Sequence, residues 1–278
     1  MATSNWKSKL SAGLIYLLLL IWLIITGYPL IFMLQNSLKG NIEFYTTPVW
    51  SFTSFRVDNY QEVITSGFYW YFINSIIVCT AAVFIIIIAA SLASYIIVRV
   101  DWQLKHFVYL LFVAGMMIPI HSTLIPVYKL TLSLGLYDTL AGLVGPYVAF
   151  SLPVSIFILT GFMREIPREM EEVAFIDGAN YYQLFTRIIF PLLKPAIATI
   201  AIYNLTLLWN EFAYALVLTS SPEKRILTLG LFEFQSAYGV DIPKTLTALL
   251  LSVIPLLIMY IFFQERVIKG MTAGAVKG

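Results

Sequence analysis

Charged side chains are scarce in this chain of 278 residues, and Asp, Glu, Lys and Arg together make up 12% of it. A soluble domain carries about 25% charged residues. Here 60% of the residues are hydrophobic, and the mean hydropathy is +0.85. The net charge of +2 comes without any dense basic cluster, which excludes a nucleic-acid partner. The composition therefore predicts a polytopic protein that is surrounded by a lipid bilayer.

Motifs of common catalytic sites are missing as well. No Gly is followed by Lys, so the chain lacks the G-x4-G-K-[ST] loop that cradles nucleotide phosphates. It has no H-E-x-x-H and no C-x-x-C, and its one cysteine, Cys79, excludes an intrachain disulfide. The two histidines, His106 and His121, are expected on opposite sides of one membrane span. We therefore expect a protein without a catalytic site, a metal or a cofactor of its own.

Six apolar stretches are long enough to span a bilayer, for which about 20 helical residues are needed. They cover residues 13–34, 72–98, 107–128, 140–163, 195–218 and 246–263. Prolines in the third and fourth stretches predict kinks that pack against neighbouring helices. The pattern indicates an all-α membrane protein with six transmembrane helices.

The distribution of Lys and Arg predicts the orientation, because cytoplasmic loops are enriched in both. Eleven of the 17 such residues fall on the side that holds both termini. They are Lys7, Lys9, Arg99, Lys105, Arg164, Arg168, Arg187, Lys194, Arg266, Lys269 and Lys277. We therefore expect both termini and residues 164–194 to lie in the cytoplasm.

Residues 164–194 form a polar, charged segment between two apolar stretches, and we call this segment the island. Pro167 suits the first position of a helix, and Gly178 can take the positive φ that ends one. Asn180 and Gln183 have the spacing of a capping box, which predicts that a second helix starts at once. Two short helices that meet at a glycine corner beside a membrane predict a docking element.

Glu211 is the one ionisable residue that the sequence places well inside a span. The helical rise puts it about 12 Å from the outer end of the fifth stretch. It can contact a substrate, brace a neighbouring helix or pair across a subunit interface. An ion-driven carrier needs coupling residues in its spans, and one acidic group without a basic partner is too few for that role.

Several short motifs occur in an order that resembles a known family. The island carries E-x-A-x3-G from Glu172 to Gly178, and I-x-F-P from Ile188 to Pro191 follows it. Further motifs are Asn74-Ser75, Ser94-Tyr95 with Arg99, Met117-Ile118-Pro119, Leu134-Gly135-Leu136, Trp209-Asn210-Glu211-Phe212, and the ending from Gln264 to Gly278. Together they resemble the permease subunits of bacterial carbohydrate ABC importers, specifically the maltose-type second permease, with its EAA loop. Val173 departs from the pattern, because the family usually has Ala there.

The resemblance implies an ABC type-1 importer (MetI-like) permease fold and a set of partners. It implies a heterodimer with a second permease, a cytoplasmic ABC ATPase dimer, an extracytoplasmic sugar-binding protein, a carbohydrate substrate and a place in the bacterial cell membrane. It further implies that the island is the coupling helix, which sits in a cleft of the ATPase. The residues that this role implies are Glu172, Ala174, Asp177, Gly178, Ile188 and Pro191. In maltose-type permeases the end of the chain, here from about Met271, also reaches the ATPase.

The resemblance also predicts the division of the chain. Residues 1–66 would hold the N-terminal anchor helix and the outer loop, residues 67–264 the permease domain, and residues 265–278 a cytoplasmic tail. Asn204, Trp209, Asn210 and Glu211 are candidates for the substrate pathway. The aromatic rings and amides of Tyr203, Asn204, Trp209 and Asn210 suit stacking on a sugar and hydrogen bonding to it.

Three other classes of protein compete with this interpretation. An ion-coupled secondary transporter usually has internal inverted repeats and coupling residues, and the sequence shows neither. A membrane enzyme needs several titratable residues at one depth, and Glu211 stands alone. A scaffold protein leaves the ordered island unexplained.

Overall fold

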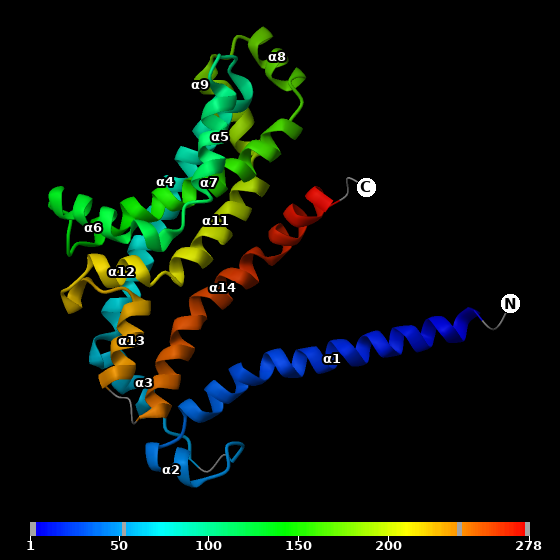
Figure 1. The fold of residues 1–278 in the computed structure, drawn as a ribbon. Coiled ribbons are helices and arrows are strands. Elements are labelled where there is room, and N and C mark those ends of the chain that lie inside the picture. Colours follow the sequence, from blue (N-terminus) through cyan, green and yellow to red (C-terminus); the bar gives the residue numbers. More distant parts are fainter. Residues whose placement is uncertain (1–3, 52–53, 238–240, 276–278) are drawn as a thin grey trace. The chain divides into compact units, whose positions relative to one another are not determined.

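The computed structural model describes residues 4–51, 54–237 and 241–275, and they form helices joined by turns (Figure 1). No strand occurs in these ranges, so the all-α prediction is confirmed. The final residues of the predicted tail, 276–278, lie outside the described part. The chain divides into two compact units: residues 1–69 with 231–254, and residues 70–230 with 255–278. The predicted domain boundary at residue 67 remains a prediction.

The first unit contains a long apolar helix and a compact loop. Helix α1 (Ser4–Ser37) continues through Pro29, and most side chains from Leu14 to Leu34 are exposed, as befits a helix surrounded by lipid. The loop holds α2 (Asn41–Thr46), α3 (Asp58–Val63) and the short π-helix η1 (Ile64–Phe68). The buried ammonium of Lys39 closes the loop by donating to the carbonyls of Pro48 and Val49.

The second unit contains the remaining helices that concern function. They are α4 (Tyr69–Arg99), α5 (Lys105–Gly115), η2 (Ile120–Thr123), α6 (Leu124–Ser133), α7 (Leu140–Glu165), α8 (Glu169–Ile176), α9 (Tyr181–Gln183), η3 (Leu184–Ile189), α10 (Phe190–Leu192), α11 (Lys194–Trp209), α12 (Ala213–Leu218) and η4 (Pro222–Lys224), followed by the start of α13 (Leu227–Ala237). The last helix, α14 (Ile242–Ala275), begins in the first unit and ends in the second. Helices α4, α7 and α11 share an apolar core that includes Ala90, Ile97, Ile156, Leu159 and Ile200.

Among the described residues, four helices are long and apolar enough to cross a membrane, or up to six if each of two bent helix pairs counts as one span. The predicted stretches 13–34, 72–98, 140–163 and 246–263 lie within α1, α4, α7 and α14. The other two stretches are interrupted by breaks between helical segments.

The third stretch bends by 97° between α5 and the following helical segment, Ile120–Ser133. Pro119 lies at the break, with an extended backbone. Proline cannot donate a backbone N–H and pushes the residue before it out of the helical region. The sequence predicted a kink within one helix here, whereas the structure has two separate helical segments at a large angle.

The second bent pair consists of Tyr181–Leu192 and Lys194–Trp209, which meet at 70° just before the fifth stretch begins. The fifth stretch itself is interrupted further on, at a point without a proline. Helix α11 ends at Trp209, and α12 begins at Ala213. The side chain of Glu211 accepts hydrogen bonds from the backbone N–H groups of Tyr214 (2.8 Å) and Ala215 (3.3 Å), which satisfies two free donors at the start of α12. The interruption therefore has its own capping group.

Candidate coupling and translocation sites

The island folds as a helix, a glycine corner and a second helix. At the end of α8, Gly178 has φ of +83°, and the N–H of Ala179 reaches the carbonyl of Ala174 (2.9 Å). The N–H of Gly178 bonds to the carbonyl of Phe175 (3.0 Å), which completes a Schellman motif. The helix starts at Glu169, two residues later than Pro167 predicted.

The predicted capping box is present at the start of the second helix. The Asn180 side chain accepts from the N–H of Gln183 (2.8 Å), and the Gln183 side chain accepts from the N–H of Asn180 (3.1 Å). Helix α9 then continues into η3, so the corner is held from both sides. The chain direction at the island is thus determined by local hydrogen bonds.

The inner face of the island packs onto the transmembrane helices. Ala174, Leu184 and Ile189 are buried in one apolar cluster with Tyr95 of α4 and Met163 of α7. This cluster gives α8 and η3 a rigid base on the bundle. Any force on the island is therefore applied to packed helices and not to a loose loop.

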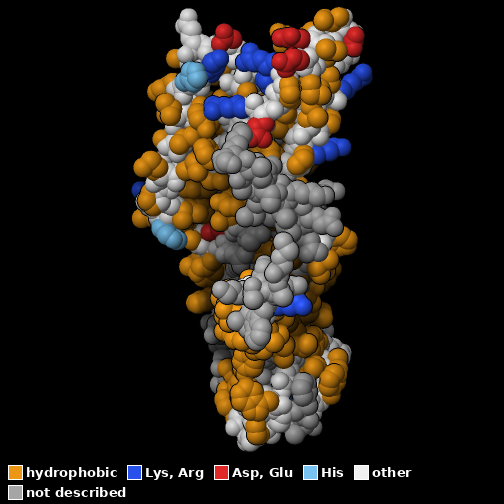
Figure 2. All heavy atoms as spheres, turned by 90° about the vertical axis from the view of Figure 1, so that its right-hand side faces the viewer, with side chains coloured by type: hydrophobic (Ala, Val, Ile, Leu, Met, Phe, Trp, Pro, Cys, Tyr) orange, Lys and Arg blue, Asp and Glu red, His pale blue; other side chains and the backbone are white. Residues whose placement is uncertain are grey.

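The outer face of the island exposes large apolar side chains outside the predicted spans. The exposed fractions are 57% for Val173, 83% for Ile176, 70% for Tyr181 and 76% for Tyr182. Figure 2 shows Lys, Arg, Asp and Glu side chains gathered among hydrophobic ones at the top of the view, which is where Figure 1 draws α8 and α9. An apolar patch with a polar rim is typical of a protein interaction site.

The predicted coupling residues divide between these two faces. Glu172, Asp177 and Gly178 are exposed, whereas Ala174 points inward and is 6% exposed. Ile188 and Pro191 are half-buried, and Ile188 packs against the inner cluster. Their roles in coupling remain predictions.

Sequence reasoning missed the exposed tip formed by Ile176, Tyr181 and Tyr182. The ring of Tyr181 lies at the surface, 5.2 Å from the ring of Phe175. A signal was available, because three large apolar residues flank the Gly178 corner in a segment outside the spans.

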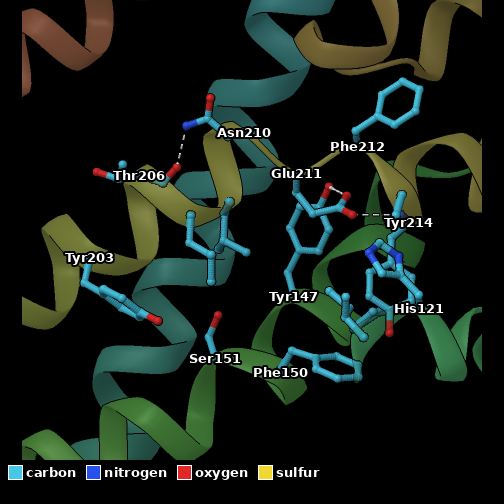
Figure 3. A pocket seen from close by; sticks show the side chains of 15 residues that line it. His121, Tyr147, Phe150, Ser151, Tyr203, Thr206, Asn210, Glu211, Phe212 and Tyr214 are labelled. Atoms are coloured by element: carbon cyan, nitrogen blue, oxygen red, sulfur yellow. Dashed lines mark hydrogen bonds between the residues drawn. The ribbon is translucent and has the colours of Figure 1, made fainter. Parts of the chain in front are cut away.

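A cavity of 780 Å³ lies where α11 is interrupted, and we call it the cavity (Figure 3). Residues from η2, α7, α11 and α12 line it. The lining comprises Ile120, His121, Pro146, Tyr147, Phe150, Ser151, Tyr203, Thr206, Leu207, Leu208, Asn210, Glu211, Phe212, Ala213 and Tyr214. Its aromatic rings alternate with hydroxyl, amide and carboxylate groups, which is the composition of a small-molecule site.

The Glu211 carboxylate is held by neutral donors at the wall of the cavity. The hydroxyl of Tyr147 donates to it (2.7 Å), in addition to the two N–H groups at the start of α12. The backbone carbonyl of Glu211 accepts from Thr228 (2.5 Å). Figure 3 shows the carboxylate between Tyr147 and Tyr214. Of the uses that the sequence allowed, bracing of neighbouring helices is the one that this geometry shows.

The other predicted pathway residues lie in different places. Asn210 lines the cavity, and its amide donates to the carbonyl of Thr206 (2.8 Å). Asn204 is fully buried and donates to Ser155 (2.8 Å), so it joins α11 to α7. Trp209 is buried edge-to-face against Phe72, with ring centroids 5.8 Å apart. Asn204 and Trp209 thus line no part of the cavity.

Tyr203, which the sequence offered as a candidate, lines the cavity from α11, whereas Phe150 on α7 and Tyr214 on α12 were missed. Aromatic residues occur throughout the spans, so the sequence offered no means of selecting them. Within the described part of the chain, no group of three His, Cys, Asp or Glu residues could hold a metal ion.

Comparison with known proteins identifies relatives along nearly the whole chain. The "Putative ABC transporter permease protein ORF2" of Caldicellulosiruptor sp. is 48% identical over 95% of this chain and 96% of the relative. The "Trehalose/maltose transport system permease protein MalG" of Thermococcus litoralis is 33% identical over 92% of this chain and 93% of the relative.

A solved structure has the same fold. It belongs to a bacterial ABC transporter involved in the import of the acidic polysaccharide alginate, and its TM-score is 0.80 at 22% identity, with 95% of this chain and 98% of the other covered. The family model described as "Binding-protein-dependent transport system inner membrane component" matches residues 82–273, which include the island and the cavity. This chain therefore belongs to the family of multi-pass inner-membrane components of binding-protein-dependent transport systems.

Proposed function

We propose that this chain is the permease subunit of an ATP-driven importer for a sugar or oligosaccharide, and that a separate ATPase docks on the island. The observation that carries this proposal is the exposed apolar tip formed by Ile176, Tyr181 and Tyr182 on a rigidly packed base. A tip of this kind buries apolar area when a partner covers it. Because this chain has no nucleotide-binding motif, we assign ATP hydrolysis to that partner.

The island is suited to transmit movement as well as to bind. Its first end is continuous with α7 and its second end with α11, which also line the cavity. A displacement of the tip therefore reaches the cavity through two helices and a packed core. We infer that this movement alternates the access of the cavity between the two sides of the membrane.

The substrate class rests on the cavity and on the relatives. Tyr203 and Phe150 offer apolar ring faces, and Asn210, Ser151 and Thr206 offer polar groups. Such a combination suits the ring faces and hydroxyls of a sugar. The relative from Thermococcus litoralis is named for trehalose and maltose, which supports the same class.

The proposed assembly follows from these roles. A second permease would form a heterodimer with this chain, an ABC ATPase dimer would bind on the cytoplasmic side, and a sugar-binding protein would deliver substrate from outside. The excess of Lys and Arg supports cytoplasmic termini and a cytoplasmic island.

Co-purification and uptake by reconstituted vesicles test the proposal. The wild-type chain, purified from the membranes of its native host, should retain a second permease and an ATPase. With the binding protein and ATP, the vesicles should take up maltose or trehalose. If the isolated chain accumulates either sugar without ATP, or if no ATPase co-purifies, the proposal is wrong.

Ile176→Ser sharpens the docking part of the test. The side chain is 83% exposed, so its loss leaves the fold intact but removes apolar contact area at the tip. We expect loss of bound ATPase. Leu104→Ser is the matched control, because Leu104 is 59% exposed in the turn before α5, outside the island. Equal ATPase retention by both variants would exclude the tip as the docking surface.

A further inference from the structure

The side chain of Arg99, at the end of α4, joins three segments of the second unit. Its Nη2 donates to the carbonyls of Met163 (2.9 Å) and Ile166 (2.6 Å), at the end of α7 and just beyond it. Its Nε lies 2.7 Å from Oε1 of Glu171 in α8. The two side chains are 4% and 12% exposed, so the ion pair is shielded from water. One planar guanidinium therefore connects α4, α7 and the island.

A second set of contacts supports the same junction. The ring of Tyr95, one turn before Arg99, lies 5.2 Å from the ring of Phe185 in η3. The hydroxyl of Ser94 donates to the carbonyl of Ile156 (3.3 Å) and accepts from Thr160 (3.3 Å), both in α7. The last turns of α4 thus contact both helical segments of the island and the helix that leads into it.

Chain connectivity gives this junction a particular importance. The backbone joins the island directly to α7 and α11, whereas α4 ends at Arg99 and leads to α5. No backbone segment joins α4 directly to the island, so the contacts between the two are made by side chains. The Arg99–Glu171 pair is the charged contact at that point, and a guanidinium suits it because its fixed fork holds several acceptors at once.

We propose that Arg99 is a positioning residue that fixes α4 to the island, so that α4 and α8 move as one body during transport. The proposal rests on the proposed docking of an ATPase on the island. It extends the moving part of the permease to a helix that is not adjacent to the island in the chain. Lys at this position would keep the charge but would not reproduce the three-way contact.

Distance measurements between spin labels test the proposal. The labels would replace Ile96 on α4 and Glu169 on α8, which are both exposed, in a Cys79→Ala background that removes the one native thiol. The complex with its partner subunits would be measured without nucleotide and after trapping with ATP and vanadate. We expect the same distance distribution in both states. A shift of the wild-type distance between the states would overturn the proposal.

Arg99→Gln should broaden the distribution even without nucleotide, and should lower sugar uptake per ATP hydrolysed. Arg99→Lys should show the same two changes to a smaller degree. The control is Arg164→Gln, which removes a charge from the exposed end of α7, where Arg164 lies over the Tyr109 ring (5.4 Å). An Arg99→Gln distribution as narrow as that of the control would overturn the proposal.

These outcomes are distinguishable from a failure of the proposed function. If no ATPase binds the complex, the docking role of the island is wrong. The comparison of Arg99→Gln with the wild type in the absence of nucleotide still tests the link, because it needs only the permease.

Discussion

Two glutamates of the second unit are partly buried, and the protein holds them in different ways. Glu171 in the island faces the guanidinium of Arg99, whereas Glu211 at the cavity is held by a tyrosine hydroxyl and two backbone N–H groups. An ion pair between separate segments is sensitive to the loss of either partner, because a buried charge is left behind. A carboxylate with several neutral donors tolerates the loss of one. The contact of Glu171 is therefore more sensitive to a single substitution than the contacts of Glu211 are.

The largest expected effect comes from breaking the helix that presents Glu171. Ala174→Pro removes a helical hydrogen bond and adds a ring at a buried position, which costs about 3 kcal/mol or more locally. We expect the protein to insert into the membrane and the cavity wall to remain, but ATP-driven uptake to be lost. Uptake by reconstituted vesicles and membrane levels of the protein measure this. Uptake at the wild-type rate would contradict the coupling role of α8.

Gly178→Asp affects the same island at its corner and should be milder for stability. The residue has φ of +83°, a conformation that costs an L-residue about 1–2 kcal/mol. Nothing lies within 4 Å of the added Cβ, so the cost comes from the backbone and from the new charge on an interaction surface. We expect reduced ATPase retention with normal membrane insertion. The control is Gly135→Asp, because Gly135 has a similar φ of +68° and lies in a turn outside the island. Gly145 lies in a span and is therefore unsuitable as a control.

Gly135→Asp should therefore carry a comparable backbone cost without affecting ATPase binding. If both variants lose the ATPase equally, general destabilisation and not the island corner is responsible.

The sequence predicted local features of the island better than its contacts. The capping box and the glycine corner each involve residues only a few positions apart, so both could be predicted from the sequence. The Arg99–Glu171 pair and the Tyr147–Glu211 bond join residues that are far apart in the chain, and neither could be predicted from one sequence.

The breaks in the third and fifth stretches likewise show that local features are easier to predict from the sequence than packing is. The corner at Pro119 was foreseen as a kink because proline acts locally, but its angle of 97° depends on packing. The interruption after Trp209 was missed, since it depends on the Glu211 side chain capping α12 in place of a continuous helix.

A smaller effect is expected from removing one donor at the cavity. Tyr147→Phe deletes the hydroxyl that donates to Glu211, while the two N–H donors remain. A typical hydrogen bond contributes about 1 kcal/mol, and one to a charged group somewhat more. We expect a modest fall in thermal stability with sugar uptake and ATPase retention preserved. A complete loss of uptake would show that Glu211 depends on a single donor, as Glu171 does on Arg99.

The smallest expected effect is on the pH dependence of stability, which should differ in sign between Glu171 and a second carboxylate, Asp138. Burial raises the pKa of Glu171 above its ordinary value of 4.5, and the nearby Arg99 offsets this only in part. The folded state therefore binds this proton more tightly than the unfolded state does. The contribution of Glu171 to stability is fully present below pH 4.5 and is lost as the pH rises through the raised pKa.

Asp138 should show the opposite behaviour. This residue, with φ of +58°, accepts hydrogen bonds from the hydroxyl of Ser221 and from the N–H groups of Ser220 and Ser221, and these bonds lower its pKa. Its contribution is present above the ordinary value of 3.8 and is lost as the pH falls through the lowered pKa. Thermal denaturation in detergent, compared with Glu171→Gln and Asp138→Asn across acidic pH, measures both. Relative to the wild type, Glu171→Gln should gain stability as the pH rises and Asp138→Asn should gain as it falls. Parallel profiles for the two variants would mean that the Arg99 charge, and not burial, dominates at Glu171.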